Sequence, residues 1–392
     1  MRDAYSIESG TPAAPAPPAL WDERDGQVLA AQLRKRMAEP GHETILQVEF
    51  QAVPGFTILF GASGAGKTTL LDCVAGLATP DSGRISIGNG VVFDLSRGID
   101  LAVAKRRVGY VLQDLALFPH LSVAQNVEYG LVHLAKTERR DRATAILSAF
   151  HIAHLARRSA REISGGESQR VALARTLVTN PAVLLLDEPL AALDTPTKAR
   201  IIDDLREWNR THRIPILYVT HSREEVFALG ERVLVLDAGR IVADGTPYEV
   251  MLAPLQETVA QLAGFENIFD AVVEAVRPER GTMTCSVAAD GAPLQLETPL
   301  VRGGGGLPLR VGIRAGDILL ATSPPLGLSA RNVIPGRITS LERRDAMIVA
   351  RVQCRVEMEV HLTLAARDSL ELDTGKEVWL VIKTHSCHLM RR

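Results

Sequence analysis

The sequence predicts an α/β domain followed by a smaller all-β domain. Three observations lead to this expectation. A glycine-rich loop lies between a strand-like and a helix-like segment, and further along the chain a continuous apolar run ends in two acids. From Asn267 onward the pattern changes to short alternating strands separated by glycine and proline turns, which is typical of an all-β domain.

Length and composition set limits on the class of protein. With 392 residues the chain is long enough for two or more domains, and its formal net charge of -2 gives no hint of a nucleic-acid partner. No apolar run has the length that spans a bilayer, so any transmembrane pathway is expected on another polypeptide. Residues 11–20 are rich in proline and alanine, and the N-terminus has no signal-peptide features, which predicts a disordered leader over residues 1–25. Four widely separated cysteines are typical of reduced, mostly buried thiols in a cytoplasmic protein.

The glycine-rich loop is a phosphate-binding P-loop. A strand is predicted over residues 56–60 and a helix over residues 68–75, which is the setting that this loop requires. Backbone N–H groups would surround the phosphates, Lys67 would neutralise the β/γ charge, and Thr68 would offer its hydroxyl to Mg²⁺. The predicted nucleotide-binding residues here are Gly61, Ala62, Ser63, Gly64, Ala65, Gly66, Lys67, Thr68 and Thr69.

The apolar run over residues 182–186 predicts a strand that is buried on both faces. Two acids, Asp187 and Glu188, follow it. Beside the P-loop, Asp187 would hold Mg²⁺ directly or through water. Glu188 would polarise the attacking water as a general base, a contribution of about 10² to 10⁴ in rate.

A serine-glycine-glycine turn and a helix precede these acids. Ser164, Gly165, Gly166 and Glu167 resemble the LSGGQ signature of ATP-binding cassette (ABC) ATPases, with glutamate in place of glutamine. The serine hydroxyl, the glycine amides and the helix N-terminus would form a second anion site, which cannot serve the P-loop of its own chain. The resemblance implies an α/β P-loop NTPase fold, that is, an ABC cassette with a helical subdomain.

The resemblance also assigns roles to later residues. In this family two cassettes stack head to tail, so that each ATP lies between the P-loop of one copy and the signature of the other. A second copy of this chain is therefore the implied partner. Gln113 resembles the Q-loop glutamine, which reaches the metal and water, and His221 resembles the switch histidine that contacts the γ-phosphate. Residues 191–194 resemble the D-loop, with Asp194 as its acid and alanine replacing the usual serine.

Many ABC cassettes stack an aromatic residue, from a loop upstream of the P-loop, on the adenine ring, and this sequence offers no such residue there. The stretch 34–43, which we expect to be a loop upstream of the P-loop, contains no Tyr, Trp or Phe. His42 is its only planar candidate.

The region between Gln113 and the signature, about residues 114–162, is expected to be the helical subdomain. Residues 143, 146, 147 and 150 mark one apolar helix face. Residues 114–122 resemble the docking segment of importer cassettes, and Phe118 and Leu121 are the candidates for contact with a permease subunit.

After His221 the pattern predicts a helix at 222–229, a strand at 232–236 and a helical stretch over 246–262. Alternation over 348–362 then predicts a small β-barrel. The segments 265–269 and 330–334 open similar runs of strands, so we expect a repeat, with two barrels in tandem joined through residues 303–306.

The start of the second run of strands, around residues 330–334, resembles the molybdate-binding Mop domain, as does the closing strand at 381–386. The resemblance implies an all-β, OB-like Mop/TOBE barrel. An oxyanion site needs hydroxyls, amides and one or two cations, with no hydrolytic acid nearby. The candidate ligands are Ser329, Arg331, Asn332 and Lys383. The alternative is a barrel that serves only dimer contact.

Together these motifs resemble the ATPase subunits of molybdate (or tungstate) ABC importers, and ATP and Mg²⁺ are the implied substrate and cofactor. The expected division is a leader (1–25), the nucleotide-binding domain (26–255), a linker helix with a first β segment (256–325) and the Mop/TOBE-like domain (326–392). Implied partners are permease subunits and, indirectly, a periplasmic or extracellular oxyanion-binding protein, with the chain peripheral on the cytoplasmic face of the inner membrane. Alternatives are a sulfate, thiosulfate, ferric-iron or sugar importer, or a molybdate-binding protein without a transport role.

Overall fold

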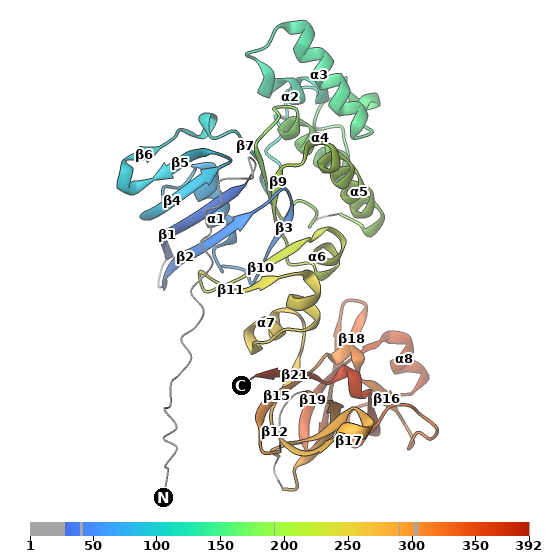
Figure 1. The fold of residues 1–392 in the computed structure, drawn as a ribbon. Helices are drawn as coiled ribbons and strands as arrows, with labels where there is room; N and C mark the ends of the chain where they lie inside the picture. Colours follow the sequence, from blue (N-terminus) through green and yellow to red (C-terminus); the bar gives the residue numbers. More distant parts are fainter. Residues whose placement is uncertain (1–27, 40–41, 192, 290, 302–304, 392) are drawn as a thin grey trace, which may run out of the picture.

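The computed structural model describes residues 28–39, 42–191, 193–289, 291–301 and 305–391. The predicted leader lies outside the described residues. Figure 1 shows an N-terminal body, which we define as residues 28–266, above a C-terminal body, residues 267–391. Within these ranges no helix has the length and apolar character to cross a membrane.

The N-terminal body is built on a sheet of eleven strands in the order β6-β5-β4-β1-β2-β11-β10-β3-β9-β8-β7. These strands are β1 Leu29–Glu39, β2 His42–Ala52, β3 Gly55–Phe60, β4 Ser82–Ile87, β5 Gly90–Asp94, β6 Ile99–Asp100, β7 Val108–Val111, β8 Val183–Asp187, β9 Pro215–Val219, β10 Arg232–Asp237 and β11 Arg240–Gly245. The helices are α1 Lys67–Ala75, α2 Val123–Glu128, α3 Lys136–Ala149, α4 Gly165–Leu177, α5 Thr195–His212, α6 Arg223–Leu229 and α7 Glu257–Leu262, with a short π-helix at Tyr248–Leu252.

Strands β10, β3, β9, β8 and β7 are parallel, and β8 is buried along its whole length, as its apolar run predicted. Alternate residues of these strands enter two hydrophobic cores, one on each face of the sheet. In β8, Leu184 and Leu186 pack with α4, α5 and α6, whereas Val183 and Leu185 pack with α1. The carboxyl ends of β3, β8 and β9 therefore meet at one edge, where the P-loop, the two acids and His221 follow.

The antiparallel half of this sheet was not predicted. Residues 34–43, expected as a loop, instead contribute to the long β1–β2 hairpin, which pairs from Leu29 with Ala52 to Glu39 with His42. The expected helical subdomain contains α2 and α3, which lie at the top of Figure 1, and the region predicted as helical at 246–262 contains the π-helix and α7.

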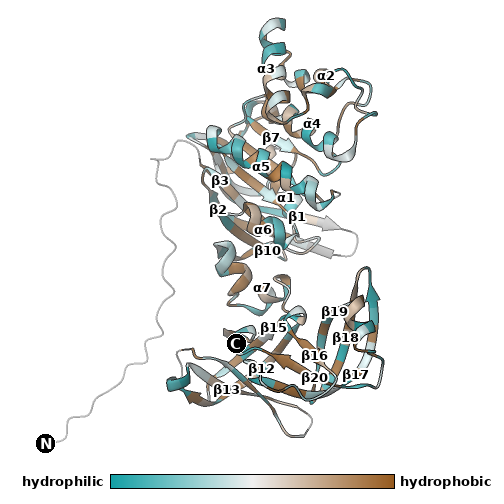
Figure 2. Cartoon of the chain, turned by 90° about the vertical axis from the view of Figure 1, so that its right-hand side faces the viewer, coloured by the Kyte–Doolittle hydropathy of each residue, from teal (hydrophilic) through white to brown (hydrophobic). Residues whose placement is uncertain are grey.

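The C-terminal body consists of two five-stranded sheets, ordered β14-β13-β12-β15-β21 and β16-β20-β17-β18-β19. Figure 2 shows brown hydrophobic residues along these strands. The elements are β12 Asn267–Arg277, β13 Thr282–Val287, β14 Leu294–Pro299, β15 Pro308–Ile313, β16 Leu319–Ala321, β17 Asn332–Arg344, β18 Met347–Cys354, β19 Val356–Thr363, α8 Leu364–Ser369, β20 Glu377–Ile382 and β21 His388–Arg391.

The predicted repeat is present in this topology as one five-stranded sheet per repeat, but the two sheets are not independent units. β12 to β15 and β17 to β20 have the same order in their sheets, and the last strand of each repeat is exchanged. β16 pairs with β20 of the second repeat, and β21 returns to pair with β15 of the first. Side chains of both sheets form one hydrophobic core, so the expected division at 325/326 does not separate two cores.

Two buried asparagines join the sheets at equivalent places. Asn267, the first residue of β12, bonds through its side chain to the backbone N–H and C=O of Glu359 at 2.7 and 2.8 Å. Asn332, the first residue of β17, does the same to Glu297, at 2.7 and 2.9 Å. Each side-chain amide therefore supplies the two hydrogen bonds that a neighbouring strand would otherwise make to that residue of the other repeat.

An Asn332→Ala substitution should lower the free energy of unfolding by about 2 to 4 kcal/mol, since a buried donor and acceptor of Glu297 would lose their partner. Chemical denaturation measures this loss. Arg331→Ala is the matched control, because Arg331 is exposed and its Nε lies 3.6 Å from the Glu297 Oε1, a surface ion pair worth little. Equal losses in the two variants would contradict the structural role of Asn332.

The C-terminal body is attached to α7 and its neighbours by polar contacts. Arg314 donates to the backbone oxygen of Met251 at 2.6 Å and its guanidinium lies over the Phe265 ring at 4.4 Å. His388 is bonded to the backbone oxygen of Pro254 at 2.9 Å, and burial lowers the pKa of this histidine. Arg310 forms an ion pair with Glu257 of α7.

Candidate functional site

The P-loop turns directly after β3 and its shape depends on glycine. A Cβ on Gly61 would lie 2.1 Å from the backbone oxygen of Leu236, so the loop passes too close to β10 for any side chain. Gly64 and Gly66 have φ angles of 78° and 101°, in the region that favours glycine. Gly66 is the residue that precedes α1, so the loop delivers its backbone N–H groups to the start of that helix.

Lys67 lies inside the loop. Its side chain is 8% exposed, and Nζ donates to the backbone oxygens of Gly61 and Ala62 at 2.8 and 2.7 Å. Burial lowers the pKa of this lysine, while the charges of Glu188 and Asp187 oppose the shift. The ammonium group is thus held where a phosphate oxygen could replace one of the two carbonyls.

Asp187 ends β8 next to this loop. Thr68 Oγ1 donates to its Oδ2 at 2.8 Å, and the carboxyl is 5% exposed. Burial raises the pKa of Asp187, and the Thr68 bond partly opposes the shift. A divalent cation would offset this penalty. Thr68, Asp187 and Gln113 line the same cleft with oxygen donors, the ligand type that Mg²⁺ prefers, so the residues present fit the ion.

Glu188 and His221 form a pair at the same edge. His221 Nδ1 lies 3.2 Å from Glu188 Oε2, with the histidine 66% exposed and the glutamate 22% exposed. Glu188 has a φ of 45°, uncommon outside glycine, and its backbone N–H donates to Val219 O at 3.1 Å. The fold of β8 and β9 thus fixes the glutamate in a strained backbone position that faces the cleft.

Lys67, Thr68, Gln113, Asp187 and Glu188 line one cleft of about 600 Å³, and His221 reaches it only through its contact with Glu188. Four residues of the cleft wall come from the β1–β2 hairpin and were not predicted to belong to the site: Lys35, Arg36, Met37 and Thr44. Met37 approaches the P-loop so closely that a Cβ on Gly66 would lie 3.2 Å from its methyl group. The side chain of His42, the adenine candidate, lies outside the described residues.

The signature turn begins α4 with reciprocal capping bonds. Ser164 Oγ accepts from the N–H of Glu167 and donates to Glu167 Oε2 at 2.8 Å, while the Ser164 N–H donates to the same carboxylate at 2.7 Å. These bonds lower the pKa of Glu167. The glutamate that replaces the usual glutamine therefore occupies the hydroxyl of Ser164 and places a negative charge beside it.

The signature does not face the P-loop of its own chain. Ser164, Gly165, Gly166 and Glu167 line a second cavity of about 800 Å³, which has no lining residue in common with the P-loop cleft. Asp194 also lines it and caps α5 by accepting from the N–H of Thr197 at 3.3 Å. Ala192 of the expected D-loop lies outside the described residues. The second cavity also contains residues that the sequence analysis missed, His151, His154, Arg170 and Arg200.

The segment expected to dock on a permease is tied to α4. Arg175 donates to the backbone oxygens of Leu115 and Ala116 at 2.7 and 2.6 Å. Its guanidinium also lies 5.5 Å from the centre of the Phe118 ring, which contacts the exposed Tyr129. Arg175 therefore links the signature helix to this surface.

The four oxyanion candidates have different surroundings. Asn332 is buried and both polar atoms of its amide are bonded to Glu297. Arg331 lies near the Glu297 carboxylate, whereas Ser329 and Lys383 are exposed. Because Asn332 pairs with Ile382, Arg331 and Lys383 come next to each other at the end of β17 and β20. An oxyanion between these cations would have to overcome the charge of Glu297.

Comparison with known proteins is consistent with both bodies. The ABC transporter family matches residues 47–191, and the TOBE domain matches residues 328–389. The chain is 36% identical to the molybdenum import ATP-binding protein ModC of Paramagnetospirillum magneticum, over 91% of this chain and 96% of that protein. It is 38% identical to ModC of Rhizobium meliloti, over 86% and 94%. The dimeric structure of MJ0796, a bacterial ABC transporter cassette, is similar to 56% of this chain, with 27% identity, a TM-score of 0.49 and 98% of that chain covered.

Proposed function

Because the chain belongs to the ModC family of molybdenum import ATP-binding proteins, we propose that it powers the uptake of molybdate or tungstate through a separate membrane permease. It is an ATPase subunit of an ABC importer, with an ABC cassette and a C-terminal TOBE domain. The observation that carries the proposal is the P-loop cleft, which brings together Lys67, Thr68, Gln113, Asp187 and Glu188.

The proposed chemistry assigns one task to each of these residues. Lys67 and the loop amides hold the β- and γ-phosphates. Thr68, Asp187 and Gln113 would hold Mg²⁺, which supplies charge neutralisation for the transferred phosphoryl group when it is bound. Glu188 accepts the proton of the attacking water, and His221, 3.2 Å from this carboxylate, would orient it and meet the γ-phosphate.

The site is completed by a second copy of the chain. The separation of the signature cavity from the P-loop cleft supports this, since each chain has both halves of the composite site but does not join them. In the proposed head-to-tail dimer, the amides of Gly165 and Gly166 and the start of α4 face the γ-phosphate bound to the partner. Asp194 lies at the same surface.

The proposed link to transport is the segment around Phe118 and Leu121. Arg175 connects this segment to α4, so a movement of the signature helix on ATP binding would move the docking surface with it. The chain would then lie on the cytoplasmic face of the inner membrane, bound to permease subunits. A periplasmic or extracellular binding protein would deliver the oxyanion.

Molybdate as the transported ion is supported by the names of the relatives. The proposed intracellular oxyanion site consists of Ser329, Arg331, Asn332 and Lys383. The negative charge of the Glu297 carboxylate would oppose the binding of an anion there. Contact between copies of the C-terminal body is the alternative role of this region.

A transport assay tests the proposal. We expect proteoliposomes that contain this chain and its permease to take up labelled molybdate and tungstate only when MgATP is supplied. Uptake of sulfate, thiosulfate, ferric iron or a sugar in preference to molybdate would contradict the proposed cargo. ATP hydrolysis without any membrane partner in pull-down experiments would contradict the transport role.

A further inference from the structure

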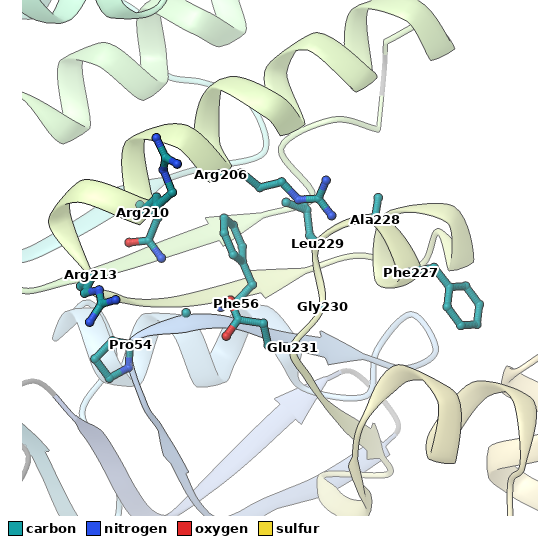
Figure 3. Close-up of a pocket in the computed structure, with 12 residues that line it drawn as sticks. Pro54, Phe56, Arg206, Arg210, Arg213, Phe227, Ala228, Leu229, Gly230 and Glu231 are labelled. Carbon is teal, nitrogen blue, oxygen red and sulfur yellow. Dashed lines mark hydrogen bonds between the residues drawn. The ribbon is translucent and has the colours of Figure 1, made fainter.

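A further pocket lined by charged residues, distinct from the P-loop cleft and the signature cavity, lies at the opposite end of the sheet from the P-loop. It has a volume of about 580 Å³ and is drawn in Figure 3. Its walls come from the β2–β3 turn, the C-terminal half of α5 and the segment that joins α6 to β10. β3 starts in this pocket and ends at the P-loop, so at about 3.3 Å per residue the two sites are roughly 20 Å apart.

Three arginines form one wall. Arg206 and Arg210 are four residues apart and share one face of α5, and Arg213 follows the helix as its C-terminal cap with a left-handed backbone. Figure 3 shows Arg206 and Arg210 on the helix above Phe56 and Arg213 to the left, near Pro54. Arg210 pairs with Glu207 at 2.8 Å at the exposed rim. Arg206 and Arg213 are exposed, and within the described residues their side chains have no ion-pair or hydrogen-bond partner.

The floor of the pocket combines apolar and polar groups. Phe56 and Leu229 are buried apolar residues of this floor. Asn209 is 6% exposed and its Oδ1 accepts from the N–H of Ile214. Glu231 accepts from the N–H of Phe56 at 3.3 Å through Oε1, and its carboxylate can accept further bonds from a ligand.

We propose that this pocket binds a phosphate ester whose body carries hydroxyl groups. Guanidinium forks bind phosphate oxygens in pairs, and two unpaired forks beside a third favour a dianion. The volume lies in the range of small-molecule sites and exceeds what a bare phosphate fills. Glu231 repels a bare anion but accepts from a ligand hydroxyl, so it selects an ester over the free ion.

Calorimetric titration of the full-length chain tests this site. The protein is first saturated with Mg²⁺ and a non-hydrolysable ATP analogue, so that the P-loop is filled, and ribose 5-phosphate and inorganic phosphate are then the probes. We expect one ribose 5-phosphate per chain, bound more tightly than inorganic phosphate. Arg206→Gln and Arg213→Gln should each weaken binding about tenfold or more, through loss of charge-assisted hydrogen bonds. Arg337→Gln, which removes an exposed guanidinium from the C-terminal body, should leave binding unchanged.

Glu231→Gln separates the two parts of the proposal. It should weaken ribose 5-phosphate and strengthen inorganic phosphate, because it removes both the acceptor charge and the repulsion. Loss of affinity for both probes would overturn the role of Glu231 in selecting the ester. Absence of saturable heat with either probe, or equal affinity in the Arg206→Gln, Arg213→Gln and Arg337→Gln variants, would overturn the site. The three arginines would then only balance the negative dipole at the C-terminus of α5.

Discussion

A Glu188→Gln variant should bind ATP normally and hydrolyse it about 10² to 10⁴ times more slowly, since the amide cannot accept the proton of the attacking water. The substitution keeps the shape of the side chain and removes one negative charge from the cleft. ATP should therefore persist between two protomers, and the ATP-bound dimer should accumulate. Phosphate release measures the rate, and size-exclusion chromatography with MgATP measures the dimer.

Two comparisons make this result specific. Glu207→Gln removes a carboxylate from the exposed face of α5, outside the cleft, and should hydrolyse ATP at the normal rate. His221→Gln removes the partner at 3.2 Å from Glu188 and should lower the rate while leaving the base present. Unchanged turnover in Glu188→Gln would remove Glu188 from the base role. A slow variant that stays monomeric with MgATP would contradict the composite site.

The parallel centre of the N-terminal body was predictable because its signals are local. An apolar run such as residues 182–186 identifies a doubly buried strand without knowledge of its neighbours, and β8 occupies that place. The β1–β2 hairpin has a different pattern. Its strands carry many charged residues that point to solvent, since only one face packs on the core, and it was read as a loop. The four hairpin residues of the cleft were missed for the same reason.

The exchange of β16 and β21 could not be inferred from the sequence. A strand that pairs within its own repeat and one that crosses to the other repeat have the same alternation of apolar and polar residues. Only long-range pairing, such as Leu309 with Arg391, distinguishes them. The repeat itself was visible in the sequence, and the exchange of its last strands was not.

Asn332 shows how a residue type can support two interpretations. In the sequence it is a polar group beside Arg331 and was assigned to an oxyanion. In the structure its amide is bonded to Glu297, and Asn267 makes equivalent bonds to Glu359 in the other repeat. Composition identifies a polar side chain, but only the fold shows whether its donors and acceptors are already used.

The sharpest test of the P-loop cleft is Lys67→Ala, which should abolish detectable ATP binding. Lys67 donates to two loop carbonyls and is the buried cation of the loop. Its removal leaves the phosphate charge without this neutralisation and the two carbonyls without their donor. Hydrogen bonds to charged groups contribute about 1.5–3 kcal/mol each, so two bonds from the ammonium to phosphate oxygens would correspond to an affinity loss of roughly 10² to 10⁴.

Thermal shift and calorimetry with MgATP measure this loss in Lys67→Ala. Lys35→Ala is the matched control, because it removes the same charge from the wall of the same cleft. Lys35 of β1 is paired at 3.4 Å with Asp81, the residue before β4, so its ammonium is already partly neutralised and its loss should weaken ATP far less. Normal binding by Lys67→Ala, or equal losses in the two variants, would mean that overall positive charge at the cleft holds the nucleotide. The buried geometry of Lys67 predicts the opposite order.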